Sequence, residues 1–66
     1  MANESQKDRE ELRFLKKVAE EFARENSDKM KDEADYAMMN FREGKAAAYT
    51  LIAQHIAEYL GEEADI

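Results

Sequence analysis

The sequence has 66 residues, a formal net charge of −6, and neither cysteine nor proline. A chain of this length is one small domain near the lower limit for independent folding, and without cysteine it has no disulfide or thiolate metal site. The acidic balance argues against direct binding to nucleic acid or to an anionic membrane, because both need positive charge. A chain this small needs support beyond its own core, and disulfides are excluded, so oligomerisation is the expected source of additional stability.

The composition also bears on location. No run approaches the roughly 20 apolar residues that span a bilayer, so we expect no membrane association through a spanning helix. The first residues, MANESQKDREE, are polar and acidic, which is unlike a secretory signal peptide. The absence of cysteine is typical of cytosolic proteins, so the expected location is the cytoplasm.

The first half of the chain has the pattern of an amphipathic helix. Asn3 or Ser5 can cap its start. Apolar residues then alternate three and four apart, the spacing that places side chains on one helix face. They are Leu12, Leu15, Ala19 and Phe22. The helix is predicted over about residues 4–25. Its predicted end is the polar stretch 26–28, because Asn, Ser and Asp compete with the helical backbone for hydrogen bonds.

The second half predicts a longer helix, over about residues 28–60. Its apolar and small residues also alternate four and three apart: Met30, Ala34, Ala37, Phe41, Gly44, Ala48, Leu51 and His55. The phase is kept through Gly44, which favours one continuous helix. The alternative is a break at 40–44, giving three short helices, because Asn40 and Gly44 are helix breakers. Gly61 is the predicted helix end, and residues 61–66 are predicted to be a frayed acidic tail of the single domain 1–66.

Helix lengths lead to a prediction of self-association. At about 1.5 Å per residue the two helices would be roughly 33 Å and 48 Å long. In an antiparallel hairpin the shorter helix would leave the uncharged stretch 46–60 bare, and a second copy would cover it as a four-helix bundle. The predicted dimer interface is Gly44, Ala48, Leu51, Ile52, His55, Ile56 and Tyr59.

Three groups of polar residues are candidates for chemistry. His55 and Glu58 stand three apart, but the metal-binding order in carboxylate bundles is the reverse. Glu20-Glu21 followed by Asp32-x-x-Asp35 resembles the Mg²⁺-binding acidic helices of all-α nucleotide pyrophosphohydrolases, with the spacing displaced by one residue. The basic residues Arg13, Lys16, Lys17 and Arg24 are interleaved with glutamates. We therefore expect no catalytic residue, no metal, no cofactor and no enzymatic activity.

A second protein is the expected partner besides another copy of the chain. Tyr36 and Met39 lie beside the apolar spacing of the second helix, and Tyr and Met suit partner surfaces because they offer area and adapt in shape. The stretch FREGKAAAY-x-x-IA resembles segments of small uncharacterised helical proteins of bacteria and their phages, a resemblance that implies no activity.

The predicted function is a small non-enzymatic interaction or regulatory module that self-associates through its second helix. The alternative is an acidic inhibitor or mimic that acts on a nucleic-acid enzyme and is phage-encoded. That alternative requires carboxylates gathered on one exposed face, and they are least mixed with basic residues at Glu58, Glu62, Glu63 and Asp65.

Overall fold

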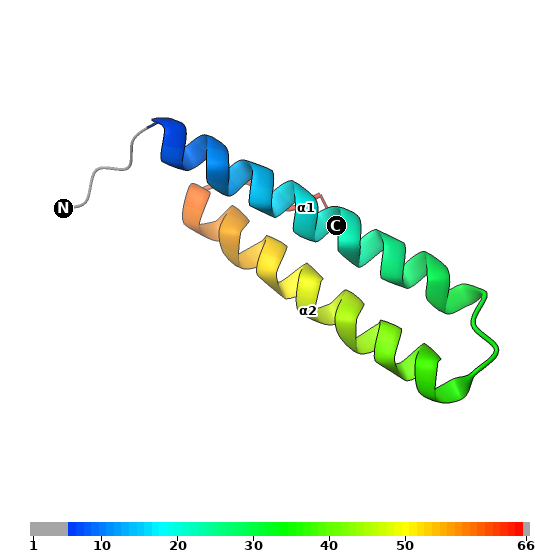
Figure 1. Ribbon diagram of the computed structural model, residues 1–66. Helices are drawn as coiled ribbons and strands as arrows, with labels where there is room; N and C mark the ends of the chain where they lie inside the picture. Colours follow the sequence, from blue (N-terminus) through cyan, green and yellow to red (C-terminus); the bar gives the residue numbers. More distant parts are fainter. Residues whose placement is uncertain (1–5, 66) are drawn as a thin grey trace.

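The computed structural model describes residues 6–65, which form two antiparallel helices joined by a short turn (Figure 1). Helix α1 is Gln6–Lys31 and helix α2 is Tyr36–Leu60. Within this part of the chain there is no strand, and the hairpin is elongated, at 49 × 16 × 14 Å. The predicted all-α hairpin is confirmed, while the predicted helix start near residue 4, with its caps, lies outside the described residues.

The turn lies later in the chain than predicted. Asn26 does not end α1: it is buried, and its side-chain Nδ2 donates to the carbonyl oxygen of Phe22 at 2.9 Å. The turn spans 32–35 and ends at Asp35, whose Oδ1 accepts from the backbone N–H groups of Ala37 (2.9 Å) and Met38 (3.3 Å). The predicted break at 26–28 was wrong because Asn26 bonds back within the helix, whereas Asp35 satisfies the free N–H groups that start α2.

Helix α2 is continuous through Gly44, as predicted, and the three-helix alternative does not form. It ends at Gly61, which has a φ of 73°. The N–H of Gly61 donates to the Glu58 carbonyl, and the N–H of Glu62 donates to the Ala57 carbonyl at 2.8 Å. Glycine suits this position because the left-handed backbone conformation carries no Cβ penalty there.

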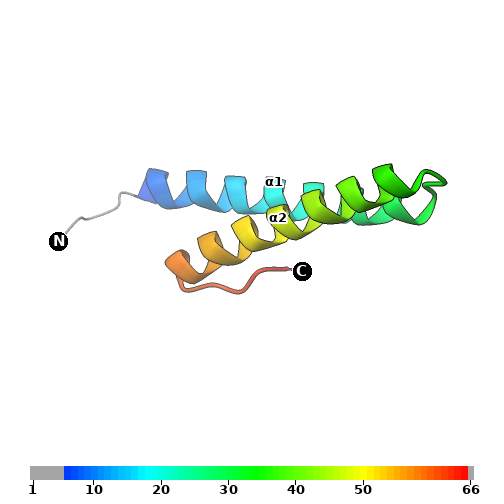
Figure 2. The same cartoon turned by 90° about the horizontal axis from the view of Figure 1, so that it is seen from below.

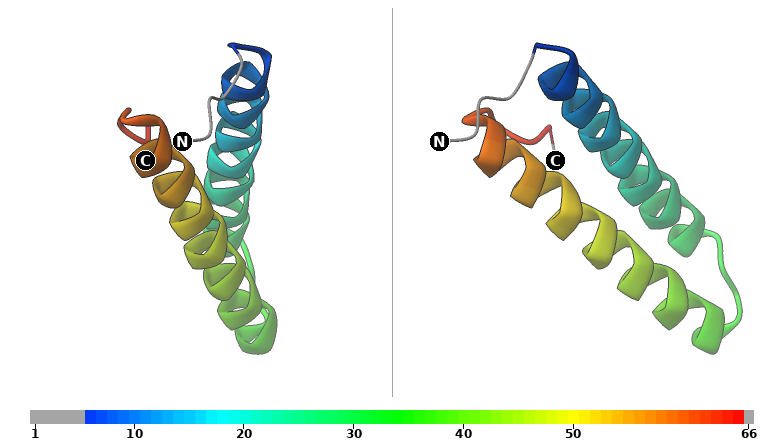
Figure 3. Two further views of the ribbon diagram at one scale, coloured as in Figure 1. Left: turned by 90° about the vertical axis from the view of Figure 1, so that its left-hand side faces the viewer. Right: turned by 60° about the vertical axis from the view of Figure 1, so that its left-hand side comes forward.

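The helices are nearly equal in length, with 26 residues in α1 and 25 in α2, and they lie side by side (Figure 3). Ala53, Ala57 and Leu60 are buried although they belong to the stretch predicted to be bare. The argument from unequal helix length was therefore wrong, because the later turn lengthens α1 and shortens α2. Any uncovered apolar surface must have another cause.

Residues 62–65 do not form the expected frayed tail, and residue 66 lies outside the described part of the chain. After Gly61 the chain reverses and runs back along the hairpin on one side (Figures 1 and 2). Residues 62–65, called the strap below, make hydrogen bonds with α1. The strap holds because its carboxylates meet the basic side chains of α1.

Candidate interaction surface

Small side chains form the contact between α1 and α2. The buried apolar residues of the described chain are Ala19 and Ala23 from α1, and Ala46, Ala53, Ala57 and Leu60 from α2. Alanine lets two helix backbones approach closely, but it buries little apolar area. Burial stabilises by about 0.8 kcal/mol per CH₂ group, so each alanine contributes little. No large side chain of residues 6–65 is fully buried, so the hairpin has only a thin core of its own.

Many large apolar side chains lie outside this contact. Nine of them are exposed among the described residues: Phe14, Leu15, Phe22, Tyr36, Met38, Phe41, Leu51, Ile52 and Tyr59. Isolated exposed apolar residues are normal on a protein surface, but a contiguous patch is not. Whether these nine side chains form an interaction surface therefore depends on how they are distributed around the two helices.

One patch spans both helices and is called the apolar flank. The ring centroids of Phe22 and Tyr49 lie 5.2 Å apart, which places these two residues on the same side of the hairpin. Leu15 lies seven residues before Phe22, and Ile52 and Ile56 lie three and seven after Tyr49. Because residues three, four or seven apart share a helix face, all five belong to this flank. The apolar flank is thus a two-helix surface of the kind that packs in bundles.

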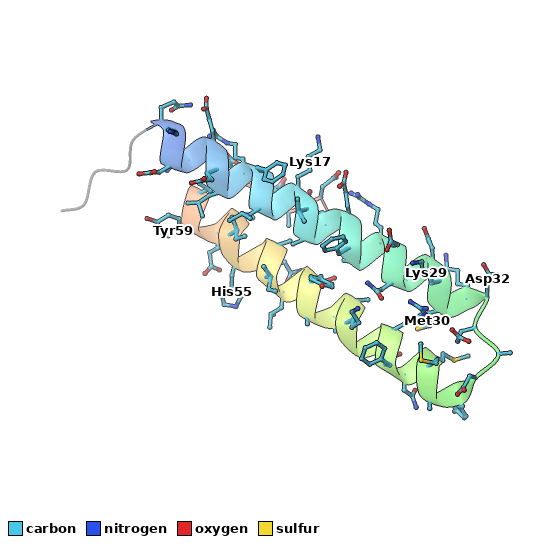
Figure 4. The ribbon with its side chains drawn as sticks, viewed as in Figure 1. Lys17, Lys29, Met30, Asp32, His55 and Tyr59 are labelled. Carbon is cyan, nitrogen blue, oxygen red and sulfur yellow. The ribbon has the colours of Figure 1, made fainter. Side chains whose placement is uncertain are left out.

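The predicted interface residues Gly44, Ala48, Leu51 and His55 form a second stripe, on the outer face of α2. All four are exposed, and they follow one another at intervals of four, three and four. His55 points away from α1 (Figure 4). The alanines that face α1 lie on the opposite side of the same helix. Helix α2 therefore has an outer face of apolar and small residues, in addition to the face that α1 covers and the side that belongs to the apolar flank.

The other predicted interface residues connect the outer face to the apolar flank. Ile52 is 47% exposed, Ile56 is half-buried and Tyr59 is exposed. A shallow hollow is lined by His55, Ile56 and Tyr59 together with Leu12 of α1. The hollow is mainly apolar.

Gly44 has no packing role within the hairpin. A Cβ atom built there meets no atom within 4 Å. A glycine inside a helix costs about 1 kcal/mol relative to alanine, so its presence here is unexplained by the chain alone. Close approach of another backbone to the outer face is the predicted reason for this glycine.

The predicted partner residues Tyr36 and Met39, which are three residues apart on α2, differ in exposure. Tyr36 is 74% exposed at the start of α2. Met39 is half-buried and lies seven residues before Ala46, on the face of α2 that packs against α1. Tyr36 therefore remains available to a partner, whereas Met39 lies largely within the hairpin contact.

Sequence reasoning missed the contribution of α1 to the exposed surface. Leu15 and Phe22 were placed on the face that covers the second helix, but alanines take that place and both larger residues remain exposed on the apolar flank. The seven-residue spacing of Leu15 and Phe22, which places them on one face of α1, can be read from the sequence. The available signal was the width of the apolar arc, which extends from Phe14 and Val18 to Ala23 and exceeds what one neighbouring helix covers.

The opposite flank is polar and holds the strap. Arg13 Nε donates to Glu62 Oε2 at 2.6 Å, and Lys16 Nζ lies 3.2 Å from Glu62 Oε1. At the other end of the strap, Arg24 contacts both the side-chain Oδ2 and the carbonyl oxygen of Asp65 at 3.0 Å. Three of the four residues of the predicted basic strip thus bind the strap, while Lys17 points away from α2 (Figure 4).

The electrostatic environment of Glu62 follows from these contacts. The hydrogen bond from Arg13, and then that from Lys16, lower the pKa of the Glu62 carboxyl below its ordinary value. Both cations favour the charged form of the carboxylate. Glu62 therefore binds α1 as an anion at neutral pH.

The acidic residues considered for metal chemistry have separate structural roles. Glu20 is buried and accepts the backbone N–H of Asp65 at 2.7 Å, whereas Asp35 caps α2. The helix rise places Glu20 about 16 Å from the end of α1, so these two carboxylates do not meet. Among residues 6–65, no three His, Cys, Asp or Glu side chains are grouped as metal ligands. His55 and Glu58 line a small surface hollow with Leu51 and Gln54.

Comparison with known proteins does not assign the chain to a family. No family model, no curated protein and no solved structure matches it. Over the described residues, neither helix combines the length and apolar character needed to cross a membrane. Function must therefore be argued from the surface itself.

Proposed function

We propose that the chain is a small cytoplasmic, non-enzymatic interaction module that self-associates through α2, forming a four-helix bundle, and presents the assembled surface to a protein partner. One observation carries this proposal: alanines fill the hairpin contact while nine large apolar side chains of the described chain stay exposed. A second hairpin placed on the apolar flank covers Leu15, Phe22 and Ile52 together.

The energetics favour association over an isolated hairpin. Full burial of a large apolar side chain contributes about 1.5–3 kcal/mol, so covering a half-exposed one contributes roughly half of that. Several such side chains from each copy amount to more than the thin alanine core supplies. The two-helix flank also suits a second copy, because a two-fold interface uses the same patch on both molecules.

Sedimentation equilibrium at micromolar concentration tests the self-association. We expect a dimer for the unmodified chain and a monomer for Ile52→Glu, because a carboxylate on the apolar flank would lose its hydration in the bundle. Helicity should fall together with the dimer, since the hairpin core is thin. An unmodified chain that sediments as a stable, folded monomer rules out self-association.

Gln54→Glu is the matched control for this substitution. Gln54 lies on the same helix and is exposed, and it gains the same charge. Two residues along a helix correspond to a rotation of roughly 200°, so this side chain does not point toward the flank. We expect it to leave the dimer intact, and equal loss of association in both variants would show that added charge alone is responsible.

The acidic-mimic alternative has weaker support. It requires a cluster of free carboxylates, and the least mixed group in the sequence was Glu58, Glu62, Glu63 and Asp65. Glu62 and Asp65 are paired with Arg13, Lys16 and Arg24. Strongly salt-dependent binding to a basic enzyme remains the measurement that would favour this alternative.

A further inference from the structure

The strap contacts α1 through more than its charges. Besides the ion pairs of Glu62 and Asp65, Lys16 Nζ donates to the carbonyl oxygen of Glu63 at 3.3 Å, and Arg24 donates to that of Asp65. The Glu20 carboxylate accepts the backbone N–H of Asp65 at 2.7 Å. This side of α1 therefore binds two acidic side chains three residues apart together with the peptide backbone that carries them.

We infer that Arg13, Lys16, Glu20 and Arg24, named the strap site, bind an acidic extended segment of a partner protein, and that residues 62–65 occupy this site until the partner segment displaces them. The contacts in place define the ligand: two carboxylates with Glu-x-x-Asp spacing on an extended backbone. Charge complementarity selects acidic segments, since three of the four residues are cationic.

Glu20 makes the site selective for a peptide over other anions. Its side chain is a buried carboxylate that needs an N–H donor. A peptide backbone supplies that donor, as Asp65 does. A nucleic-acid phosphate has no such donor and would meet a like charge at Glu20, so the strap site should discriminate against it.

The ion pair at the Asp65 end of the strap is accessible enough to exchange. The side chain of Asp65 is 85% exposed and that of Arg24 is 49% exposed, whereas Glu62 and Lys16 are more buried. Exposed ion pairs contribute about 0–1 kcal/mol each. The strap is retained largely because its tether keeps it at a high effective concentration, which reaches the millimolar range for short linkers. A partner segment with additional contacts elsewhere on the hairpin can therefore compete.

The strap site and the apolar flank are separate surfaces. Glu20 and Phe22 are two residues apart on α1, which turns their side chains roughly 200° from each other. The strap lies along one side of the hairpin (Figure 2). Peptide binding and self-association can therefore be tested separately, and loss of one does not predict loss of the other.

A nuclear magnetic resonance titration of the full ¹⁵N-labelled chain tests the inference. The probe is the acetylated, amidated peptide Gly-Glu-Glu-Ala-Asp at low salt, added to the unmodified chain and to a Glu62→Gln, Asp65→Asn double variant. In the double variant the strap has lost its charges, so we expect the peptide to shift the backbone amides of 13–24 with an apparent Kd at least roughly fivefold lower than in the unmodified chain.

Two controls define the outcomes. The neutral peptide Gly-Gln-Gln-Ala-Asn should cause no saturable shifts, and adding Arg13→Gln and Lys16→Gln to the double variant should abolish binding while the helical amide spectrum is retained. The inference is overturned if the acidic peptide does not bind the double variant, if it binds no better than the neutral peptide, or if a DNA oligonucleotide binds the strap site more tightly.

Discussion

The rings of Phe22 and Tyr49 lie 5.2 Å apart at an interplanar angle of 55°, joining α1 to α2 along the apolar flank. A tilted aromatic pair contributes about 0.5–1.5 kcal/mol beyond its buried area. Phe22 nevertheless remains 43% exposed in the hairpin. This pair is the centre of the surface that we propose a second copy covers.

Phe22→Ala should therefore lower the free energy of unfolding by more than the loss of contacts within one hairpin explains. If a second copy buries the ring, we expect a loss of about 3–5 kcal/mol in the free energy of unfolding, and a melting temperature that no longer rises with protein concentration. Phe14→Ala is the control, because Phe14 is 65% exposed and lies off the flank. Urea unfolding measures the free energy and thermal unfolding measures the melting temperature, each at two protein concentrations, and equal effects of the two substitutions would contradict the assignment of the flank.

Ala53→Leu tests the close contact between the helices. Ala53 is 0% exposed, so three added carbons must displace α1. We expect a loss of about 1–3 kcal/mol in unfolding free energy, the usual cost of overpacking. Ala47→Leu, at an exposed position of α2, should change stability by less than about 0.5 kcal/mol. A chain that tolerates leucine at both positions would show that the alanine contact is not tightly packed.

Lowering the pH should release the strap. The pKa of Glu62 is lowered in the folded chain by Arg13 and Lys16, so its contribution is fully present above the ordinary glutamate range. That contribution is lost as the pH falls through the lowered pKa. We expect the backbone amides of 62–65 to shift toward random-coil values in this acidic window. Glu62→Gln should remove this Glu62-linked transition, and a transition of the same midpoint in that variant would assign it to another group.

Asp35→Ala should weaken the start of α2. The Asp35 carboxylate accepts from the N–H groups of Ala37 and Met38, and loss of an N-cap costs about 1 kcal/mol, with a range of about 0.5–2. Asp32→Ala, in the same turn, removes a carboxylate that does not cap α2, so we expect a change within about 0.5 kcal/mol. Thermal unfolding followed by circular dichroism compares the two variants. The reverse order of effects would place the cap at Asp32.

The two glycines should respond to alanine in opposite ways. Gly61→Ala forces a side chain into a backbone with a φ of 73°, which should destabilise the helix end by about 1 kcal/mol. Gly44→Ala should stabilise the isolated helix by up to about 1 kcal/mol, because the added methyl group meets nothing within 4 Å. If a second backbone packs against Gly44, the same substitution should weaken the dimer. Sedimentation of the variant separates these effects, and tighter association would remove Gly44 from the interface.

Much of the hairpin was predictable from local chemistry. The three- and four-residue spacing around Leu12 and Phe22 identified α1, and phase continuity through Gly44 identified α2 as one helix. Gly61 was correctly predicted as the helix end. The turn was misplaced because Asn26 and Asp35 have the same intrinsic preference for helix caps, and only their surroundings distinguish them: Asn26 is buried against α2, while Asp35 meets free N–H groups.

The exposure of the outer face of α2 was predicted from the sequence, but the argument for it, from unequal helix lengths, was wrong. The residues Gly44, Ala48, Leu51 and His55 are exposed on one face, yet the reason is the alanine contact between the helices and not unequal helix lengths. The part contributed by α1 was missed. The strap was missed as well, because pairing between Arg13 and Glu62 joins residues 49 apart in sequence and leaves no local pattern.

The amino-acid sequence alone determines that this chain is helical and where α2 ends. These properties depend on residues within a few positions of one another, through helix propensity, spacing and caps. The face of α2 that meets α1, and the path of residues 62–65, follow from packing in three dimensions. Apolar or small residues occupy more than one face of α2, so spacing cannot choose between them, whereas close approach through Ala46, Ala53 and Ala57 does.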